Sequence, residues 1–189
     1  MEDRVFFFLA ALAALAIVTP AAIEIAERDR VQAVEPRAEP GGWLVIDGGA
    51  LEEVKGSKAN PAHYGPQSGL PRDGVRVNSV VATRDAGVER GAVLMLGPRA
   101  SAALAGRPVI VEVTMRSAPP PQSAGLALDL GGAAAPTDWP ASRPLAQVRR
   151  HSFKVAAAPA GPVPIRIWAD VSGQGGPVEI TRIALRPAA

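Results

Sequence analysis

Hydrophobic residues form one continuous run near the start of the chain and alternate with polar residues along most of the remainder. After Arg4, residues 5–18 contain no polar side chain, and nineteen residues separate Arg4 from the next charge at Glu24. A helix of that length extends about 28 Å, close to the hydrocarbon thickness of a bilayer. We therefore expect a membrane anchor, whose apolar residues are Val5, Phe6, Phe7, Phe8, Leu9, Leu12, Leu15, Ile17 and Val18.

Three interpretations compete for this run: a retained anchor, a cleaved secretory signal and a helix buried in a soluble core. Glu2 and Asp3 offset the positive charge that a signal peptide needs before its apolar region. The best cleavage site, after Ala21, places Pro20 between the two small residues. A helix that is apolar on every side needs a large protein around it. These features favour the retained anchor.

The helical pattern continues beyond the apolar run, with Ile23, Ala26 and Val34 spaced among charged residues until Glu35-Pro36 ends it. Residues 36–42 have no periodicity and are rich in proline and glycine, which is typical of a linker. We therefore divide the chain into an anchor helix with a polar extension (1–35), a linker (36–42) and a globular domain (43–189).

The globular domain shows the period-two alternation of half-buried strands, for example in residues 75–81, 109–116 and 126–130. Shorter candidates are residues 43–47, 92–96, 148–155, 163–170 and 178–185, and only residues 101–104 resemble a turn of helix. The connections leave no room for crossover helices, so the strands should be antiparallel. The prediction is an all-β fold: an antiparallel two-sheet jelly-roll sandwich of about eight strands.

Composition supports this fold and excludes several functions. With 19 Gly and 19 Pro in 189 residues, a mostly helical domain is disfavoured. The absence of cysteine excludes disulfides, thiolate zinc sites, iron–sulfur clusters and a cysteine nucleophile. The net charge of +2 comes without a basic stripe, so we expect no nucleic-acid partner.

The later part of the domain resembles the galactose-binding-like jelly rolls found in carbohydrate-binding modules. The similarity lies in LAGRPVIVEVTMRS (104–117), GLALDLGG (125–132), a loop with Trp139, HSFKVAAAPAGP (151–162) and the closing segment 165–187, about 85 residues in all. The resemblance implies a β-sandwich, sugar binding on exposed aromatic rings, and in many members a structural calcium ion.

Few aromatic residues are available for such binding. Trp43 and Trp168 lie inside strand patterns and are expected in the core. Trp139, beside Asp138 in a loop, is the candidate contact for a glycan or protein partner, unless it caps the end of the sandwich. Tyr64 and His63 form a second candidate in a Gly/Pro-rich segment, for which a solvated loop is the simpler interpretation.

Catalytic and metal-binding patterns are missing. The chain has no G-x-S-x-G elbow, H-E-x-x-H motif or P-loop, so we expect no enzyme. The two histidines, His63 and His151, are 88 residues apart, and His151 follows Arg149 and Arg150 on a strand, where we expect it to face solvent. Arg72, Arg76 and Arg84 are likewise expected on solvated faces.

Asp47, Asp129 and Asp170 each end a strand near glycine, where turn capping is the expected role. The alternative, implied by the resemblance, is a structural calcium ion held by these carboxylates. We expect no other cofactor.

Two functions remain. We favour a non-catalytic, single-pass membrane protein whose domain is an accessory subunit of a larger membrane complex; the alternative is a membrane-anchored carbohydrate-binding module holding a cell-surface glycan. Counting Arg4 against Arg28 and Arg30 would keep the domain in the cytoplasm. We expect the opposite, an inner-membrane anchor with a cytoplasmic N-terminus and a periplasmic domain, because a long domain translocates largely regardless of charge.

Overall fold

The computed structural model describes residues 32–66, 73–80, 91–118, 125–131, 140–143, 145–170 and 176–188. The chain divides into two units, Met1–Val31 and Gln32–Ala189. The predicted anchor belongs to the first unit and lies outside the described residues, so it stays a prediction. Within the described ranges, no helix combines the length and the apolar character needed to cross a bilayer.

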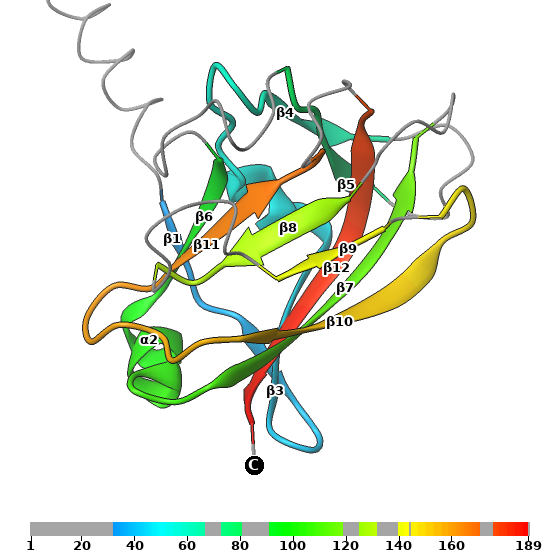
Figure 1. Ribbon diagram of the computed structural model, residues 1–189. Coiled ribbons are helices and arrows are strands. Elements are labelled where there is room, and N and C mark those ends of the chain that lie inside the picture. The colour runs from blue at the N-terminus through cyan, green and yellow to red at the C-terminus, as the bar shows by residue number, and fades with distance from the viewer. Residues whose placement is uncertain are drawn as a thin grey trace, which may run out of the picture. The chain divides into compact units, whose positions relative to one another are not determined.

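The second unit consists of two β-sheets, which Figure 1 shows layered over each other. Sheet A has the order β1 (Ala33–Val34), β6 (Ala92–Leu96), β11 (Pro164–Trp168), β8 (Leu126–Asp129) and β9 (Ala141–Ser142). Sheet B has the order β10 (Arg149–Val155), β7 (Val109–Ser117), β12 (Val178–Pro187), β3 (Trp43–Asp47) and β2 (Arg37–Glu39); β5 (Gly74–Val77) also pairs with β12, and β4 (Ala62–Gly65) with β5. All pairs are antiparallel except β1 with β6. The predicted all-β, two-sheet sandwich is confirmed.

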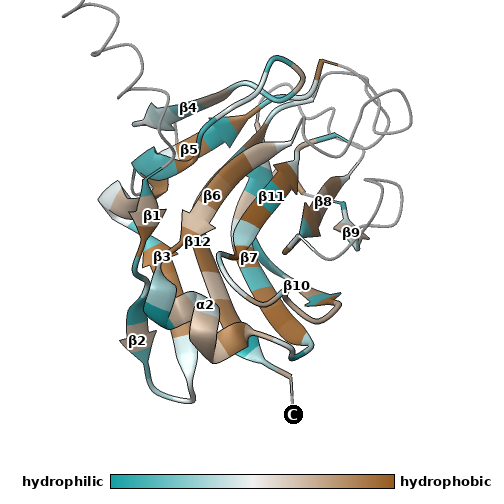
Figure 2. Ribbon diagram, turned by 90° about the vertical axis from the view of Figure 1, so that its left-hand side faces the viewer, coloured by the Kyte–Doolittle hydropathy of each residue, from teal (hydrophilic) through white to brown (hydrophobic). Residues whose placement is uncertain are grey.

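Alternation along the strands builds the core between the sheets. In β7 the buried residues Val109, Val111, Val113 and Met115 alternate with half-buried ones, and Figure 2 shows this as brown and teal bands. Leu94, Ile165 and Leu128 of sheet A belong to the same core cluster as β7. Each such large side chain contributes about 1.5 to 3 kcal/mol by leaving water. This burial explains why the period-two segments became strands.

Two buried polar side chains tie segments together. Ser101 Oγ donates to the Leu96 carbonyl (3.2 Å) and accepts from the Val163 amide (3.1 Å), which joins the short helix α2 (Pro98–Leu104) to sheet A. Asn60 Oδ1 accepts from the Ala169 amide at 3.2 Å. A buried acceptor left without its donor costs about 1 to 3 kcal/mol, so these contacts specify the loop positions.

His151 is not solvent-facing as expected. It shares the inward side of β10 with Phe153 and Val155, and its Nδ1 shares a hydrogen bond of 2.8 Å with Ser142 Oγ of β9. The two residues belong to edge strands of different sheets, so this bond closes one side of the sandwich. The arginines before His151 suggested a solvated strand, but the pleat places alternate residues on opposite sides.

The structure also corrects the beginning of the domain. Ala33 and Val34, expected as the end of a helix, form β1, and residues 37–39 within the expected linker form β2. Glu35 then caps α2 from 64 residues away: Arg99 N donates to its Oε1 at 3.0 Å and Ala100 N to its Oε2 at 3.4 Å. Arg37 and Glu39 of the expected linker form ion pairs with residues on other strands of the domain.

The structure has twelve strands in the described ranges where about eight were predicted. The additional ones, β1, β2, β4 and β9, contain only two to four residues. Such short pieces show no alternation that a sequence pattern can detect. The 3₁₀ helix η1 (Gly48–Glu53) was likewise not predicted, whereas the helical turn at 101–104 is confirmed within α2.

Candidate functional site

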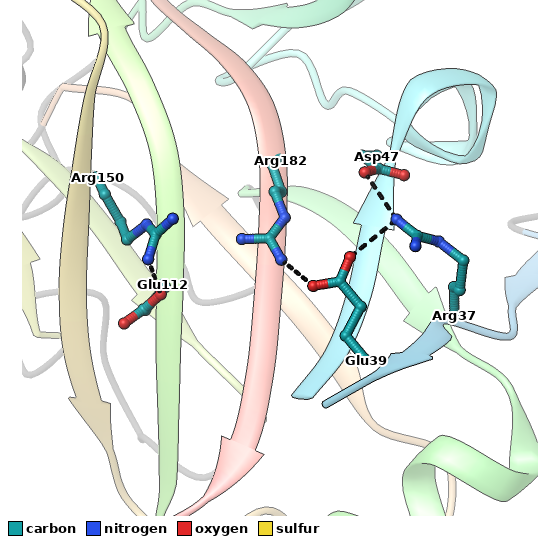
Figure 3. A network of polar contacts seen from close by, with 6 residues as sticks. All are labelled: Arg37, Glu39, Asp47, Glu112, Arg150 and Arg182. Carbon is teal, nitrogen blue, oxygen red and sulfur yellow. Dashed lines mark hydrogen bonds and ion pairs between the residues drawn. The ribbon is translucent and has the colours of Figure 1, made fainter. Parts of the chain in front are cut away.

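The outward side of sheet B, which faces away from the core, carries many charged side chains whose positions are set by the strands. Residues on each strand that alternate with core residues point to this side: Arg182 and Arg186 flank Leu185 and Ile183 of the core, and Glu112 lies between Val111 and Val113. We call this surface the charged face. It is defined by Arg37, Glu39, Asp47, Glu112, Arg150 and Arg182 of Figure 3, together with Trp43, Lys154, Glu179, Arg116 and Arg186.

Ion pairs link neighbouring strands across the charged face (Figure 3). Glu39 of β2 accepts from Arg182 of β12 at 2.7 Å and pairs with Arg37 at 3.0 Å. Arg37 also reaches Asp47 of β3 at 3.3 Å. On the other side, Arg150 of β10 pairs with Glu112 of β7 at 3.4 Å. These ion pairs hold the long side chains in defined positions. Without the pairs, the same side chains would be mobile on the sheet surface.

At one end of the face a fifth pair is deeply buried. Arg116 Nε donates to Glu179 Oε2 at 2.6 Å, and the side chains are only 11% and 3% exposed. Charged groups so far from water need each other, because removing one partner leaves an uncompensated buried charge. Arg76 of β5 is the cross-strand neighbour of Glu179. This end of the face is therefore rigid.

At the opposite end, the Arg186 guanidinium lies over the Trp43 ring, 4.5 Å from its centroid. Trp43 is half-buried on the outward side of β3, so the expectation that it belongs to the core is wrong. Arg186 Nε is buried and has no hydrogen-bond partner in the described part of the chain. Such cation–π stacking contributes about 0.5 to 2 kcal/mol and holds the guanidinium in place.

Between the two ends of the charged face, small side chains are buried beneath longer ones. Val45 and Ala184 are cross-strand neighbours on the outward side, yet only 2% and 1% exposed. The longer side chains around them must therefore cover this strip. Long arginine stems commonly bury their methylene groups in this manner while their charged heads stay in water.

The predicted contact residues Tyr64 and His63 point to opposite sides of β4. Tyr64 packs against the core, and burial, followed by the charges of Asp73 and Glu52, raises the pKa of its hydroxyl above 10.0. His63 is exposed and opposite Arg76, beside the charged face. The two residues thus do not form one surface, and a ligand contact by either stays a prediction. Trp139 and Asp138 lie outside the described residues.

The three aspartates do not fit a shared calcium site. Asp129 accepts from the Gly131 amide at 2.7 Å, which confirms turn capping there, and it also pairs with Arg166 at 3.5 Å. Asp47, instead of capping η1, pairs with Arg37 on sheet B. Asp170 is buried after β11, where its carbonyl accepts from Trp168 Nε1. Among the described residues, no three His, Cys, Asp or Glu side chains gather as metal ligands.

Sequence analysis missed the charged face because it treated each arginine separately. Arg149 and Arg150 are exposed as expected, but Arg150 also belongs to the ion-paired network. A signal was present: polar residues occupy every second position in 112–116 and 150–154, alternate with inward-facing residues, and are charged at both ends of each segment. Ion-pair partners on the charged face are up to 143 residues apart, as Arg182 and Glu39 are, and no local pattern reveals them.

Comparison with known proteins gives no family. No family profile and no curated protein matches the chain. Among solved structures, it is similar to the CBM22-1 xylan-binding domain of Paenibacillus barcinonensis Xyn10C, with 9% identity, a TM-score of 0.46, and coverage of 82% of this chain and 94% of that one. The C-terminal family 22 carbohydrate-binding module of Clostridium thermocellum Xyn10B matches with 12% identity, a TM-score of 0.42, and coverage of 85% and 97%. The module CtCBM11 matches with 10% identity, a TM-score of 0.43, and coverage of 85% and 98%.

Proposed function

We propose that this domain is a non-catalytic binding module whose charged face holds a glycan chain. The observation that supports the proposal is the combination, on one open sheet face, of ion-paired side chains in a row and a half-buried indole, Trp43. A glycan chain needs hydrogen-bond donors and acceptors along its length. It also needs an aromatic surface on which its sugar rings can stack.

The arrangement favours a polar ligand over an apolar one. The large hydrophobic side chains exposed in the described part are Val80, Leu145 and Val148, and none of them lies on a strand of sheet B. Stable protein interfaces usually centre on apolar or aromatic anchors surrounded by a polar rim. The charged face has the polar groups without such a centre, apart from Trp43 at one end.

Ordered side chains also reduce the cost of binding. Immobilising a long, flexible side chain costs about 0.5 to 1.5 kcal/mol when a ligand arrives. Arg37, Arg182 and Arg150 already hold defined positions through Glu39, Asp47 and Glu112. We infer that their remaining N–H groups are available to ligand hydroxyls without that full cost.

The test is a screen of polysaccharides and oligosaccharides with the full-length protein in mild detergent, followed by calorimetric titration. We expect Trp43→Ala to weaken binding at least about tenfold, as loss of an aromatic contact at a binding surface does. Arg149→Ala is the matched control, because Arg149 is exposed on β10 and contacts Gln147 rather than the charged face. Absence of binding to every glycan tested, with the protein folded, would reject the proposal.

We also propose that residues 5–18 tether this module to the inner membrane with the domain in the periplasm. The support is the uncharged stretch between Arg4 and Glu24. Since the chain has no cysteine, Ser152→Cys on the exposed strand β10 gives a single labelling site. Labelling of intact spheroplasts by an impermeant maleimide is expected; labelling only after lysis would reverse the orientation. Release of the protein by alkaline carbonate would exclude the tether.

A second candidate function is docking on a larger membrane complex. It is favoured by the exposed Leu145 and Val148, at 52% and 38%, which flank the start of β10 beside the exposed Arg149. A small apolar pair with a neighbouring cation can serve as the centre of a modest contact. Co-purification of the same membrane proteins with the native chain, lost in Leu145→Glu, would support docking. Recovery of the chain alone would reject it.

A further inference from the structure

We propose that the glycan bound by the charged face is acidic, and that Arg186 and Lys154 form a subsite for its carboxylate. This inference rests on the proposed function and adds the chemical class of the ligand. It arises from two neighbouring cations on the charged face that have no carboxylate partner among the described residues.

Register places the two cations in one row. Ile110 of β7 is the cross-strand partner of both Arg186 of β12 and Lys154 of β10. Because Ile110 lies between the core residues Val109 and Val111, all three side chains point to the outward side. Adjacent strands are about 4.8 Å apart, so the two Cα atoms lie roughly 10 Å apart across Ile110. In the structure the Arg186 guanidinium lies over Trp43 of β3, so a small group held by both cations would lie between this guanidinium and Lys154, above Arg186 and Ile110.

The other charges on the face are matched. Its four carboxylates, Glu39, Asp47, Glu112 and Glu179, each pair with an arginine, namely Arg37, Arg116, Arg150 or Arg182. Neither Arg186 nor Lys154 has a carboxylate partner among the residues that the structure describes. Arg186 and Lys154 therefore place two unmatched positive charges in neighbouring positions at the Trp43 end of the face.

Arg186 is prepared for an anion. Its guanidinium lies over the Trp43 ring, 4.5 Å from the centroid, which holds it in place on the face. Its Nε lacks a hydrogen-bond partner. A guanidinium of this kind binds a planar carboxylate through two parallel hydrogen bonds, and Lys154 adds a second positive charge.

A sugar acid fits this combination better than a neutral sugar. Its carboxylate satisfies Arg186 and Lys154, its ring can approach the half-exposed Trp43 and Ile110, and its neighbours along the chain reach the ion-paired row. A neutral chain would leave the two cations unmatched and would gain nothing from them. The bound unit at this end is therefore a uronic acid within a polysaccharide.

The experiment compares polygalacturonate oligomers with their fully methyl-esterified counterparts of equal length, using the full-length protein in detergent. We expect the acidic oligomer to bind at least about tenfold more tightly, the range of one charge-assisted bidentate contact. This advantage should shrink as salt is raised from low concentration to 0.5 M, because screening weakens exposed charge pairs.

Variants locate the subsite. Arg186→Gln and Lys154→Gln should each remove most of the advantage for the acidic oligomer and leave esterified binding within about twofold. Arg186→Lys should retain only part of the advantage for the acidic oligomer, because an ammonium group cannot form two parallel hydrogen bonds with a carboxylate. Arg149→Gln is the matched control and should change neither affinity. Unchanged thermal unfolding confirms that each variant is folded.

The outcomes separate the two proposals. Equal binding of acidic and esterified oligomers would reject the acidic subsite while supporting a glycan-binding face. Equal loss of both in Arg186→Gln would also reject it. A sulfated oligomer that binds as tightly as the uronate, with the same response to the variants, would show recognition of charge alone and overturn the carboxylate assignment. No binding of any of these oligomers, with binding of a neutral glycan in the wider screen, would reject the acidic subsite alone. No binding of any glycan in that screen would reject the proposed function itself.

Discussion

Trp43 and Trp168 occur in similar strand patterns and end in opposite environments. The expected burial of Trp168 is confirmed, although both tryptophans point to the side of their strand away from the cluster between the sheets: Ile167 and Ala169 belong to that cluster, and Trp168 lies opposite Ala127 of β8. Trp168 is nevertheless completely buried, and its Nε1 donates to the Asp170 carbonyl at 3.1 Å. Trp43 stays half-buried beneath Arg186. The outward side of sheet A is thus closed at this point, whereas that of sheet B is open to a ligand.

The comparison predicts different costs for the two rings. Trp168→Ala should lower the free energy of unfolding by about 3 to 5 kcal/mol, because it leaves a large cavity and removes the hydrogen bond to the Asp170 carbonyl. Trp43→Ala should cost only about 1 kcal/mol, since it loses a half-exposed contact. Urea denaturation followed by far-UV circular dichroism measures both. Similar losses for the two variants would show that the outward sides do not differ.

Within the charged face, the buried and exposed ion pairs should differ as well. Arg116→Ala should cost about 3 kcal/mol, because it leaves Glu179 charged at 3% exposure. Arg150→Ala should cost less than about 0.5 kcal/mol, since Arg150 is 63% exposed and screened by water. The same denaturation assay decides the matter, and a large loss for Arg150→Ala would contradict the view that this pair mainly orders the face.

At the edge of sheet A, we expect a smaller loss of stability that depends on two residues together. Gly97 leaves room for the Glu35 carboxylate, and a Cβ at that position would meet it. Glu35→Ala should cost about 1 kcal/mol, the usual value of a lost helix cap. Gly97→Ala should cost more in the native background than in Glu35→Ala, where the clash is absent. A double-mutant cycle of thermal unfolding measures this coupling, and strictly additive losses would refute it.

The smallest expected effect concerns pH at the edge where the two sheets meet. Burial lowers the pKa of His151 below its ordinary value of 6.5, so the folded state favours the neutral ring. Its contribution to stability is complete above pH 6.5 and is lost as the pH falls below that value, because the unfolded chain then binds the proton more readily. His151→Gln should flatten the melting temperature between pH 7 and 5 relative to the native chain, and His63→Gln, an exposed histidine, should not.

Particular residues show how far sequence reasoning reached. The strands 43–47 and 92–96 were predicted with their observed bounds, because each is a short apolar run between two glycines. Trp168 and Trp43 gave the same local pattern, yet only one is fully buried. Burial of a residue that points away from the core depends on segments distant in sequence, which local periodicity does not record.

The candidate site followed the same rule. His63 and Tyr64 are adjacent in sequence and were grouped as one surface, but neighbouring strand residues point to opposite sides. Arg182 and Glu39 are 143 residues apart and are in direct contact. Only pairing of β2 with β3 and of β3 with β12 brings them together, and β2 is too short to be recognised in advance.

The attachment of β1 has a mechanical consequence. Its two residues pair with β6, Gly97 N donates to the Val34 carbonyl at 2.7 Å, and Glu35 holds the first turn of α2. Tension applied to the chain before residue 32 would load these few bonds before any strand of the interior. Under such tension, β1 can detach from β6 by breaking these few contacts, while the two sheets of the sandwich stay folded.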